Sequence, residues 1–318
     1  MKQTPIPTCA KELMLSLVKG RICPNKIWEK KSYRTKFLLR SLIFSNQTLP
    51  LLKMLVKYPD LDRVLNVQPS LPCKLQRPYL AANLTPKQAR KALEIHYQHI
   101  FTSFPEKMRA GILSKEFYKL ADIRGKDDNT LSVLLMSDDR YNREGEVTLF
   151  VQNADNITLA KMTFTIINTN DKTCFFIGGC QGAEQNIDHA LIQQATKISY
   201  GLFPKRLALE SLRYLGCYLN IDHIIAVSDR THIYHSWRYR IKRKAMHASY
   251  DEFWCSQEGE KDKNGYFHLP LLASQKAIED IPSKKRAEYR RRYELLDQLE
   301  QAIALHFPLL PAKSHQQH

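Results

Sequence analysis

Ile177-Gly178-Gly179-Cys180-Gln181-Gly182-Ala183 is the stretch on which the predicted fold depends. It continues the run Thr173-Cys174-Phe175-Phe176-Ile177, whose apolar and aromatic residues are typical of a strand inside a sheet. Three glycines in five positions allow the backbone to turn sharply and leave its N–H groups uncovered. Asn186 or Asp188 can then cap a helix over residues 190–200. The pattern predicts a strand that stops at Ile177, a glycine bend and a helix.

This glycine bend has two interpretations. A bend between a strand and a helix N-terminus can be a bare tight turn, or it can hold an anion. The glycine spacing matches neither the phosphate-loop pattern nor the dinucleotide fingerprint, so no nucleotide motif decides between them. In the ligand-binding interpretation, the residues that face the anion are Gly178, Gly179, Gln181, Gly182 and Ala183.

Strand patterns lie on both sides of this segment. Residues 130–136, 147–151 and 157–167 are joined by short polar connections and predict an antiparallel meander that ends in the strand before the glycines. His223-Ile224-Ile225-Ala226-Val227 is continuously apolar, as is usual for a strand covered on both faces. Two predicted helices precede it and provide a crossover long enough to make it parallel to the strand before the glycines. A ligand crevice is expected beyond the ends of these two strands.

The first part of the chain predicts helices instead of strands. Thr85 and Pro86 begin a helix that runs to about residue 101, and a further helical piece is expected over residues 105–120. The predicted fold class is therefore α+β, in which an N-terminal helical region precedes a mixed, mainly antiparallel sheet with flanking helices. The expected division is a basic helical region over residues 1–122 and a mixed α/β domain over residues 123–318 that contains the glycine bend.

The charge of the chain predicts acidic partners. Its formal net charge is +16, and residues 1–60 contain nine Lys and three Arg against three acidic residues. A basic, partly apolar helical region of this kind can contact an anionic membrane surface or a phosphorylated ligand, or it can be a solvated helix face. Seven cysteines without a C-x-x-C pair indicate a reducing compartment, and no apolar stretch reaches the roughly 20 residues that span a bilayer. These features favour a cytoplasmic protein, with peripheral contact at the inner membrane as one option.

Five segments of the chain form a recognisable set. They are Phe175-Phe176-Ile177-Gly178-Gly179-Cys180-Gln181-Gly182, Gly201-Leu202-Phe203-Pro204-Lys205, Ser236-Trp237-Arg238-Tyr239, Tyr250-Asp251-Glu252-Phe253-Trp254 and Phe37-Leu38-Leu39-Arg40-Ser41-Leu42. With these segments the chain resembles the VirK/YbjX family of bacterial proteins over nearly its full length. This resemblance implies a role in virulence, in the bacterial envelope and in resistance to host antimicrobial peptides, and it implies no settled biochemical activity.

The order of the predicted elements is also similar to that of GNAT-type acyltransferases. In those enzymes a turn after the meander holds a pyrophosphate, and a splayed pair of parallel strands holds a pantetheine arm. Residues 178–183 and 223–227 occupy the corresponding places here. The usual Gln/Arg-x-x-Gly-x-Gly/Ala order is absent, and the predicted crossover has two helices instead of one. The resemblance implies coenzyme A or an acyl thioester as the cofactor.

Acyl transfer requires a base that deprotonates the acceptor and an acid that protonates the leaving thiolate. Each candidate can also be a cap, a solvated residue or a core-edge residue. No carboxylate or Cys lies at zinc spacing from the histidines near residue 232, so no metal is expected. The base candidates are Glu184, Asp229, His232 and Asp251, and the acid candidates are Tyr234 and Tyr250.

The sequence supports two hypotheses of different class. One is an acyltransferase that uses an acyl thioester donor and acts on an acceptor of the bacterial envelope. The other is a non-catalytic peripheral membrane or phospho-ligand-binding factor that works through the basic N-terminal region. Residues 234–244 mix aromatic and basic side chains without a recognised nucleic-acid-binding motif, so nucleic acid is not an expected partner.

Overall fold

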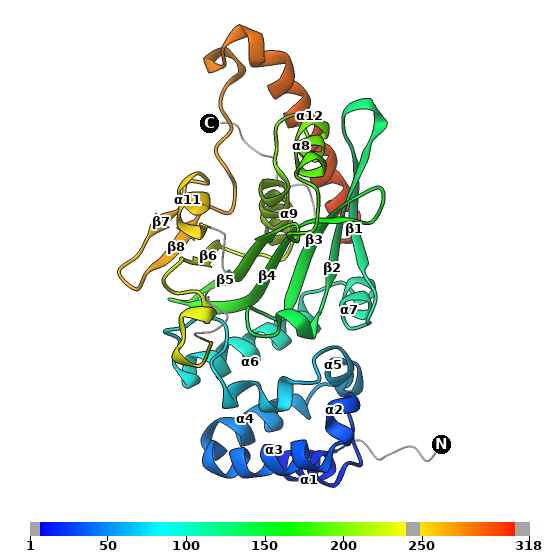
Figure 1. Ribbon diagram of the computed structural model, residues 1–318, viewed down its shortest axis with the longest axis vertical. Helices are drawn as coiled ribbons and strands as arrows, with labels where there is room; N and C mark the ends of the chain where they lie inside the picture. The colour runs from blue at the N-terminus through cyan, green and yellow to red at the C-terminus, as the bar shows by residue number, and fades with distance from the viewer. Residues whose placement is uncertain (1–6, 240–248, 309–318) are drawn as a thin grey trace.

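The structure, a computed structural model, describes residues 7–239 and 249–308. These residues form an eight-stranded sheet in the order β1-β2-β3-β4-β5-β6-β8-β7, with helices on both faces (Figure 1). The strands β1 to β5 form an antiparallel meander. The strands are β1 (Tyr118–Arg124), β2 (Thr130–Met136), β3 (Val147–Asn153), β4 (Thr158–Thr169), β5 (Lys172–Gly182), β6 (His223–Val227), β7 (Glu260–Lys261) and β8 (Tyr266–Leu269).

Helices precede, interrupt and follow the sheet. The α-helices are α1 (Ala10–Lys19), α2 (Lys26–Glu29), α3 (Lys31–Ile43), α4 (Ser45–Leu55), α5 (Leu61–Val67), α6 (Pro86–Thr102), α7 (Glu106–Ile112), α8 (His189–Ile198), α9 (Pro204–Tyr218), α11 (Tyr250–Cys255) and α12 (Ser283–Ala304). The 3₁₀ helices are η1 (Leu71–Gln76), η2 (Lys126–Asp128), η3 (Asp139–Tyr141), η4 (Ile233–His235), η5 (Trp237–Tyr239) and η6 (Ile278–Asp280).

The α+β class is confirmed, with an N-terminal helical region followed by a mixed sheet. Helix α6 begins with the predicted cap, because the Thr85 hydroxyl accepts from the Gln88 N–H and the Gln88 side chain accepts from the Thr85 N–H. Helices α6 and α9 cover opposite faces of the sheet (Figure 1), and a continuous apolar core runs from the N-terminal helices to α12.

The helix predicted over residues 105–120 is too long. Helix α7 ends at Ile112, and Tyr118 already begins β1, so the meander has five strands and not the four that were expected. Strand β1 lies at the end of the sheet and buries Leu120, Ala121 and Ile123 between exposed charged residues. This short, partly exposed strand has a weak apolar alternation, and therefore its sequence did not distinguish it from the preceding helix.

The predicted stop at Ile177 is also wrong. Strand β5 continues through Gly182, and a register shift in its pairing with β4 leaves Gly178 as the extra residue of a β-bulge. The glycines at 178, 179 and 182 do not have a positive φ. Gly178 and Gly179 instead allow Glu144 to lie close to the strand. A Cβ at Gly178 would overlap the Glu144 carbonyl oxygen, and a Cβ at Gly179 would overlap the Glu144 carboxylate.

The predicted parallel strand is present and separates from its neighbour. Strands β5 and β6 pair from Cys174 and His223 to Ile177 and Ala226. Beyond this point β5 runs on to Gly182 whereas β6 ends at Val227, so the last residues of β5 have no partner in β6; this end of the pairing is called the divergence. Helix α11 covers the divergence, because the Cys180 N–H donates to the Tyr250 hydroxyl at 3.1 Å and the Trp254 indole N–H donates to the Val227 carbonyl at 2.8 Å.

Candidate functional site

A buried carboxylate lies where β5 leaves β6. Glu144 precedes β3, and its side chain is 2% exposed. The Gln181 amide donates to both carboxylate oxygens, at 3.2 and 3.0 Å, and His232 Nε2 lies 3.4 Å from Glu144 Oε1. With Tyr250 these residues form the Glu144 cluster. Glu144 was not among the predicted site residues, and the only signal of it in the sequence is the pair of glycines that make room for it.

His232 is held by one ring nitrogen, Nδ1. Its Nδ1 accepts from the Tyr234 N–H at 3.3 Å, so the proton of the neutral ring lies on Nε2, the atom that faces Glu144. This Nε2 makes no well-aligned hydrogen bond to the residues that the structure describes. The lone pair on Nδ1 already accepts a hydrogen bond from the Tyr234 N–H. The geometry therefore favours His232 as a positioning residue over His232 as a general base.

Tyr250 lies beside His232 in the cluster. Its ring is buried and lies 5.2 Å from the His232 ring, between centroids. Burial, and next the negative charge of Glu144, raise the pKa of Tyr250 well above its usual value, so the phenol stays protonated at neutral pH. Its oxygen accepts from the Cys180 N–H, which leaves its own proton to be donated.

The thiol beside this tyrosine is not activated. Cys180 is buried, and burial raises the pKa of its thiol to about 12, although the nearby Lys205 charge acts in the opposite direction. A neutral thiol is a poor nucleophile. The cluster therefore favours proton transfer and binding over covalent chemistry at Cys180.

Two of the remaining predicted catalytic residues contact this cluster, because Asp229 bonds to Tyr250 and the Tyr234 ring lies 4.9 Å from the His232 ring. Glu184 is exposed, and its carboxylate accepts from the Lys161 ammonium at 3.1 Å. Asp229 accepts from the Tyr250 N–H at 2.8 Å, while its own N–H donates to Asp251 at 2.8 Å. Asp229 and Asp251 thus hold the start of α11 against the loop after β6. The structure brings His232, Tyr250 and Asp229 together, whereas Glu184 pairs with Lys161.

A cavity of about 810 Å³ opens between the end of β5, α8, the start of α9 and α11. Gly182, Ala183 and Glu184 line it, whereas Gly178, Gly179 and Gln181 contact Glu144 instead. Its other lining residues are Leu159, Gln185, Ile187, His189, Ile192, Phe203, Pro204, Lys205, Ser249, Glu252, Phe253 and Ser256.

The charged residues that line this cavity are Lys205, at the start of α9, and the carboxylates Glu184 and Glu252. Helix α9 begins beside it with Pro204 after the cap residue Phe203, whose side chain makes no capping hydrogen bond. The unpaired N–H groups at a helix start carry partial positive charge, and Lys205 adds a full one. The Lys205 ammonium lies 6.0 Å from the Phe253 ring centroid. A ligand with a phosphate and an apolar arm fits this combination.

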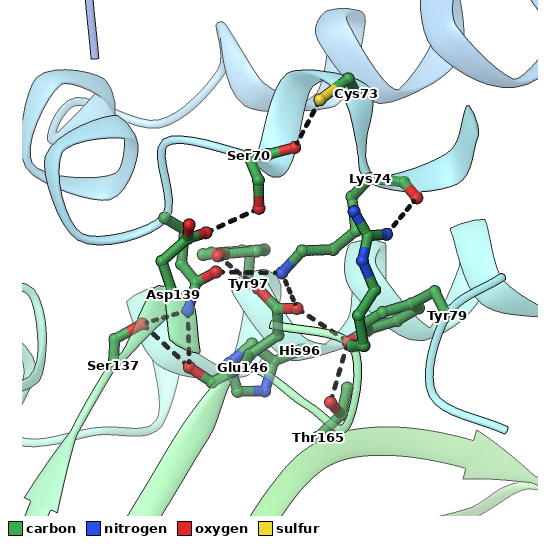
Figure 2. A network of polar contacts seen from close by, with 12 residues as sticks. Ser70, Cys73, Lys74, Tyr79, His96, Tyr97, Ser137, Asp139, Glu146 and Thr165 are labelled. Carbon is green, nitrogen blue, oxygen red and sulfur yellow. Dashed lines mark hydrogen bonds and ion pairs between the residues drawn. The ribbon is translucent and has the colours of Figure 1, made fainter. Parts of the chain in front are cut away.

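A second buried carboxylate joins the N-terminal helices to the sheet (Figure 2). Glu146 forms an ion pair with Lys74 of η1 and accepts from the hydroxyls of Tyr79 at 2.8 Å and Tyr97 at 2.7 Å. The Lys74 ammonium also donates to Gln68 at 3.1 Å. Burial lowers the pKa of Lys74, and the Glu146 charge opposes this effect. Because the side chains of Lys74 and Glu146 are 0% and 1% exposed, this network stabilises the fold and offers no access to a ligand.

The buried His96, beside this network, should make the folded protein less stable in acid. Its buried Nδ1 accepts from the Ile166 N–H at 3.2 Å, and burial lowers its pKa from 6.5 to about 3. Between these values the unfolded chain binds a proton that the folded chain does not, so stability should fall as pH decreases, by up to about 1.4 kcal/mol per pH unit. We expect His96→Gln, which keeps an acceptor, to flatten this dependence in urea unfolding from pH 6.5 to pH 4. If the free energy of unfolding of His96→Gln depends on pH as steeply as that of the wild type, this prediction is wrong.

Together these features define an α+β protein with a ligand-sized cavity at the diverging ends of two parallel strands. Residues 26–305 match the family described as "Protein of unknown function (DUF535)". The uncharacterized protein YbjX of Escherichia coli K12 is 42% identical over 295 residues, which cover 93% of this chain and 89% of that protein. An uncharacterized protein of Haemophilus influenzae is 31% identical over 157 residues, 49% of this chain and 51% of its own.

The chain belongs to the VirK/YbjX family, whose relatives reported above are described as uncharacterized. The resemblance seen in the sequence is therefore confirmed at the level of the family. Within the described residues, helices that are both long enough and apolar enough to cross a bilayer are not found. Of the basic aromatic run over residues 234–244, the positions from Arg240 onward lie outside the described part of the chain.

Proposed function

We propose that this protein transfers an acyl group from coenzyme A or another acyl thioester, in the manner of GNAT-type acyltransferases. The observation that carries the proposal is the divergence of the parallel strands β5 and β6 beyond Ile177, beside a cavity of about 810 Å³. The start of α9 and Lys205 would receive the phosphates, and the apolar walls would receive the thioester arm. Two features depart from the GNAT-type pattern: the crossover contains two helices, and the usual turn motif is missing.

The residues have distinct proposed roles. Tyr250 donates the proton to the leaving thiolate, because its oxygen accepts from the Cys180 N–H and its own proton is left to be donated. Glu184 lines the cavity and is the carboxylate placed to deprotonate an acceptor. Gln181 holds the Glu144 carboxylate through two hydrogen bonds, and His232 lies beside it. Asp229 positions Tyr250 through its backbone.

The acceptor that we propose is a component of the bacterial envelope, acylated from the cytoplasmic side. This part of the proposal, together with a role in virulence and in resistance to antimicrobial peptides, rests on the family resemblance. No metal enters the proposed reaction, since a base, an acid and a bound thioester are sufficient for acyl transfer.

A specific observation favours a second candidate, the non-catalytic binding of a phosphorylated ligand. Two side chains of α11 already hydrogen-bond to the backbone at the divergence. The Tyr250 hydroxyl accepts from the Cys180 N–H, and the Trp254 indole N–H donates to the Val227 carbonyl. A pantetheine arm would find these groups occupied unless α11 moved. A shorter phosphorylated ligand would need only Lys205 and the start of α9.

Lys205→Glu should weaken the binding of coenzyme A by about tenfold or more, because it replaces a charge-assisted phosphate contact with repulsion. The measurement is isothermal titration calorimetry with coenzyme A and acetyl coenzyme A. Lys172→Glu is the matched control, since it makes the same charge change on an exposed residue at the opposite end of β5. Both variants should keep the wild-type melting temperature within a few degrees.

Tyr250→Phe separates the two candidates. An acyltransferase should retain coenzyme A binding and lose most of the release of free thiol from an acyl thioester, whereas a pure binding protein should release no thiol in either form. If the wild-type protein binds neither coenzyme A nor its acyl thioesters, acyl transfer from this donor is ruled out. Inorganic pyrophosphate is then the probe for the second candidate.

A further inference from the structure

The corner between α3 and α4 exposes a group of apolar side chains. Leu39 is 55% exposed, Leu42 64%, Ile43 74% and Phe44 39%. These four residues are the apolar corner. They lie at the end of the molecule opposite α8 and α12, away from the candidate site (Figure 1). A contiguous apolar surface of this kind in a soluble domain marks a contact with a partner or a membrane.

Three cations surround a small cavity beside this corner. Lys36 and Arg40 of α3 and Arg77, just after η1, line a cavity of about 150 Å³ together with Tyr33, Phe37, Cys73 and Gln76. In the described part of the chain, no carboxylate lies within ion-pair distance of these cations. An anion is therefore the chemical complement of this cavity.

The wall of the cavity contains an unsatisfied polar group. Gln76 is 5% exposed, and its amide nitrogen donates to the Ser41 hydroxyl at 3.1 Å. Its Oε1 is buried and has no hydrogen-bond partner among the described residues. A buried acceptor of this kind is costly unless a donor reaches it. The cavity thus suits a ligand that carries both an anionic phosphate and a hydrogen-bond donor.

The cavity and the apolar corner share one helix face. Lys36, Leu39, Arg40 and Ile43 follow the spacing i, i+3, i+4, i+7, which places them on one side of α3, and the buried Phe37 adjoins this side, since it also lines the cavity. A phosphate bound by the cations would therefore lie next to the exposed apolar side chains. This is the arrangement that a phospholipid presents, with a charged head group above its acyl chains.

We propose that the α3–α4 surface docks on a bilayer that contains anionic phospholipids. Lys36, Arg40 and Arg77 bind the phosphodiester of one lipid, and a head-group hydroxyl, such as those of phosphatidylglycerol, donates to Gln76. The apolar corner enters the boundary between the head groups and the acyl chains. This surface is separate from the cavity beside α9, so its test does not depend on the proposed acyl transfer.

The test is cosedimentation of the full-length protein with vesicles of phosphatidylcholine alone or mixed with phosphatidylglycerol. We expect binding to the mixed vesicles that weakens with salt, and a loss of about tenfold in affinity for Ile43→Asp and for Arg40→Glu. Leu272→Asp and Lys107→Glu are matched controls that make the same charge changes on exposed residues elsewhere, and they should bind as the wild type does.

Point substitutions are preferable to removing residues 1–60, because Trp28, Phe37 and Leu51 belong to the core. Ile43 is exposed and Arg40 is half-buried without an ion-pair partner among the described residues, so their variants should keep the wild-type melting temperature. The proposal is overturned if the wild-type protein does not bind the mixed vesicles, if it binds phosphatidylcholine equally well, or if Ile43→Asp binds as the wild type does. Full competition by glycerol phosphate would also overturn it, because a free phosphate would then be a sufficient ligand.

Discussion

Lys74→Met should lower the free energy of unfolding by about 3–5 kcal/mol, the largest effect expected of any single substitution proposed for this protein. The change removes the cation that neutralises Glu146 in a site where neither side chain is exposed to more than 1%. The Tyr79 and Tyr97 hydroxyls would still donate to the carboxylate, but they carry no compensating charge. Urea unfolding followed by circular dichroism at neutral pH measures the loss.

The double variant Lys74→Met/Glu146→Gln is the control. It removes both charges, and replacing a buried ion pair by neutral groups is much less costly than breaking it. We expect the double variant to recover at least half of the stability lost by Lys74→Met, which makes the coupling between the two substitutions strongly favourable. If the two losses simply add, the ion pair contributes nothing through its charge. The network of Figure 2 would then be ordinary packing between η1 and the sheet.

Gly179→Ala should be the second most damaging change, with a loss of roughly 1–3 kcal/mol from overpacking. A Cβ at this position would overlap the Glu144 carboxylate, which Gln181 holds by two hydrogen bonds. The carboxylate cannot move without losing those bonds. Tyr250 should report the displacement, because the Glu144 charge contributes to its raised pKa. Thermal unfolding and the ultraviolet titration of tyrosine are the two measurements.

Gly182→Ala is the matched control for this prediction. At Gly182 a Cβ would meet Lys205 Cε at 3.6 Å, an ordinary contact, so stability should change little. Adding Glu144→Ala to Gly179→Ala should relieve the overlap, and the pair should then cost less than the sum of the single changes. Equal losses for Gly179→Ala and Gly182→Ala would show that the glycines serve backbone flexibility in general and not the accommodation of Glu144.

Much of the architecture can be predicted from the amino-acid sequence. The continuously apolar His223–Val227 and the long crossover before it predict a buried parallel strand, and the structure confirms it. The Thr85 cap predicts the start of α6, and Asp188, one of two predicted caps, does accept from the Ala190 N–H at the start of α8. These features are local in sequence. Capping and apolar periodicity involve residues a few positions apart, so the sequence alone determines them.

The role of the glycines was decided by tertiary structure. A glycine that permits a positive φ and a glycine that permits another group to approach look the same in a sequence. Gly178 and Gly179 are of the second kind, and the group that approaches is Glu144, more than thirty positions earlier in the chain. The predicted anion loop is therefore a strand that accommodates an internal carboxylate, and the ligand-sized cavity begins only at Gly182.

The same distinction explains the other residues that were missed. Lys74 and Glu146 are 72 positions apart, and each alone resembles a solvated surface charge. Only the packing of η1 and α6 against the sheet removes both from water and makes their pairing necessary. Local patterns thus determined the elements, their order and the parallel pair. Contacts between distant segments, which have no local periodicity or capping signal, decided which polar groups are buried and where a ligand can enter.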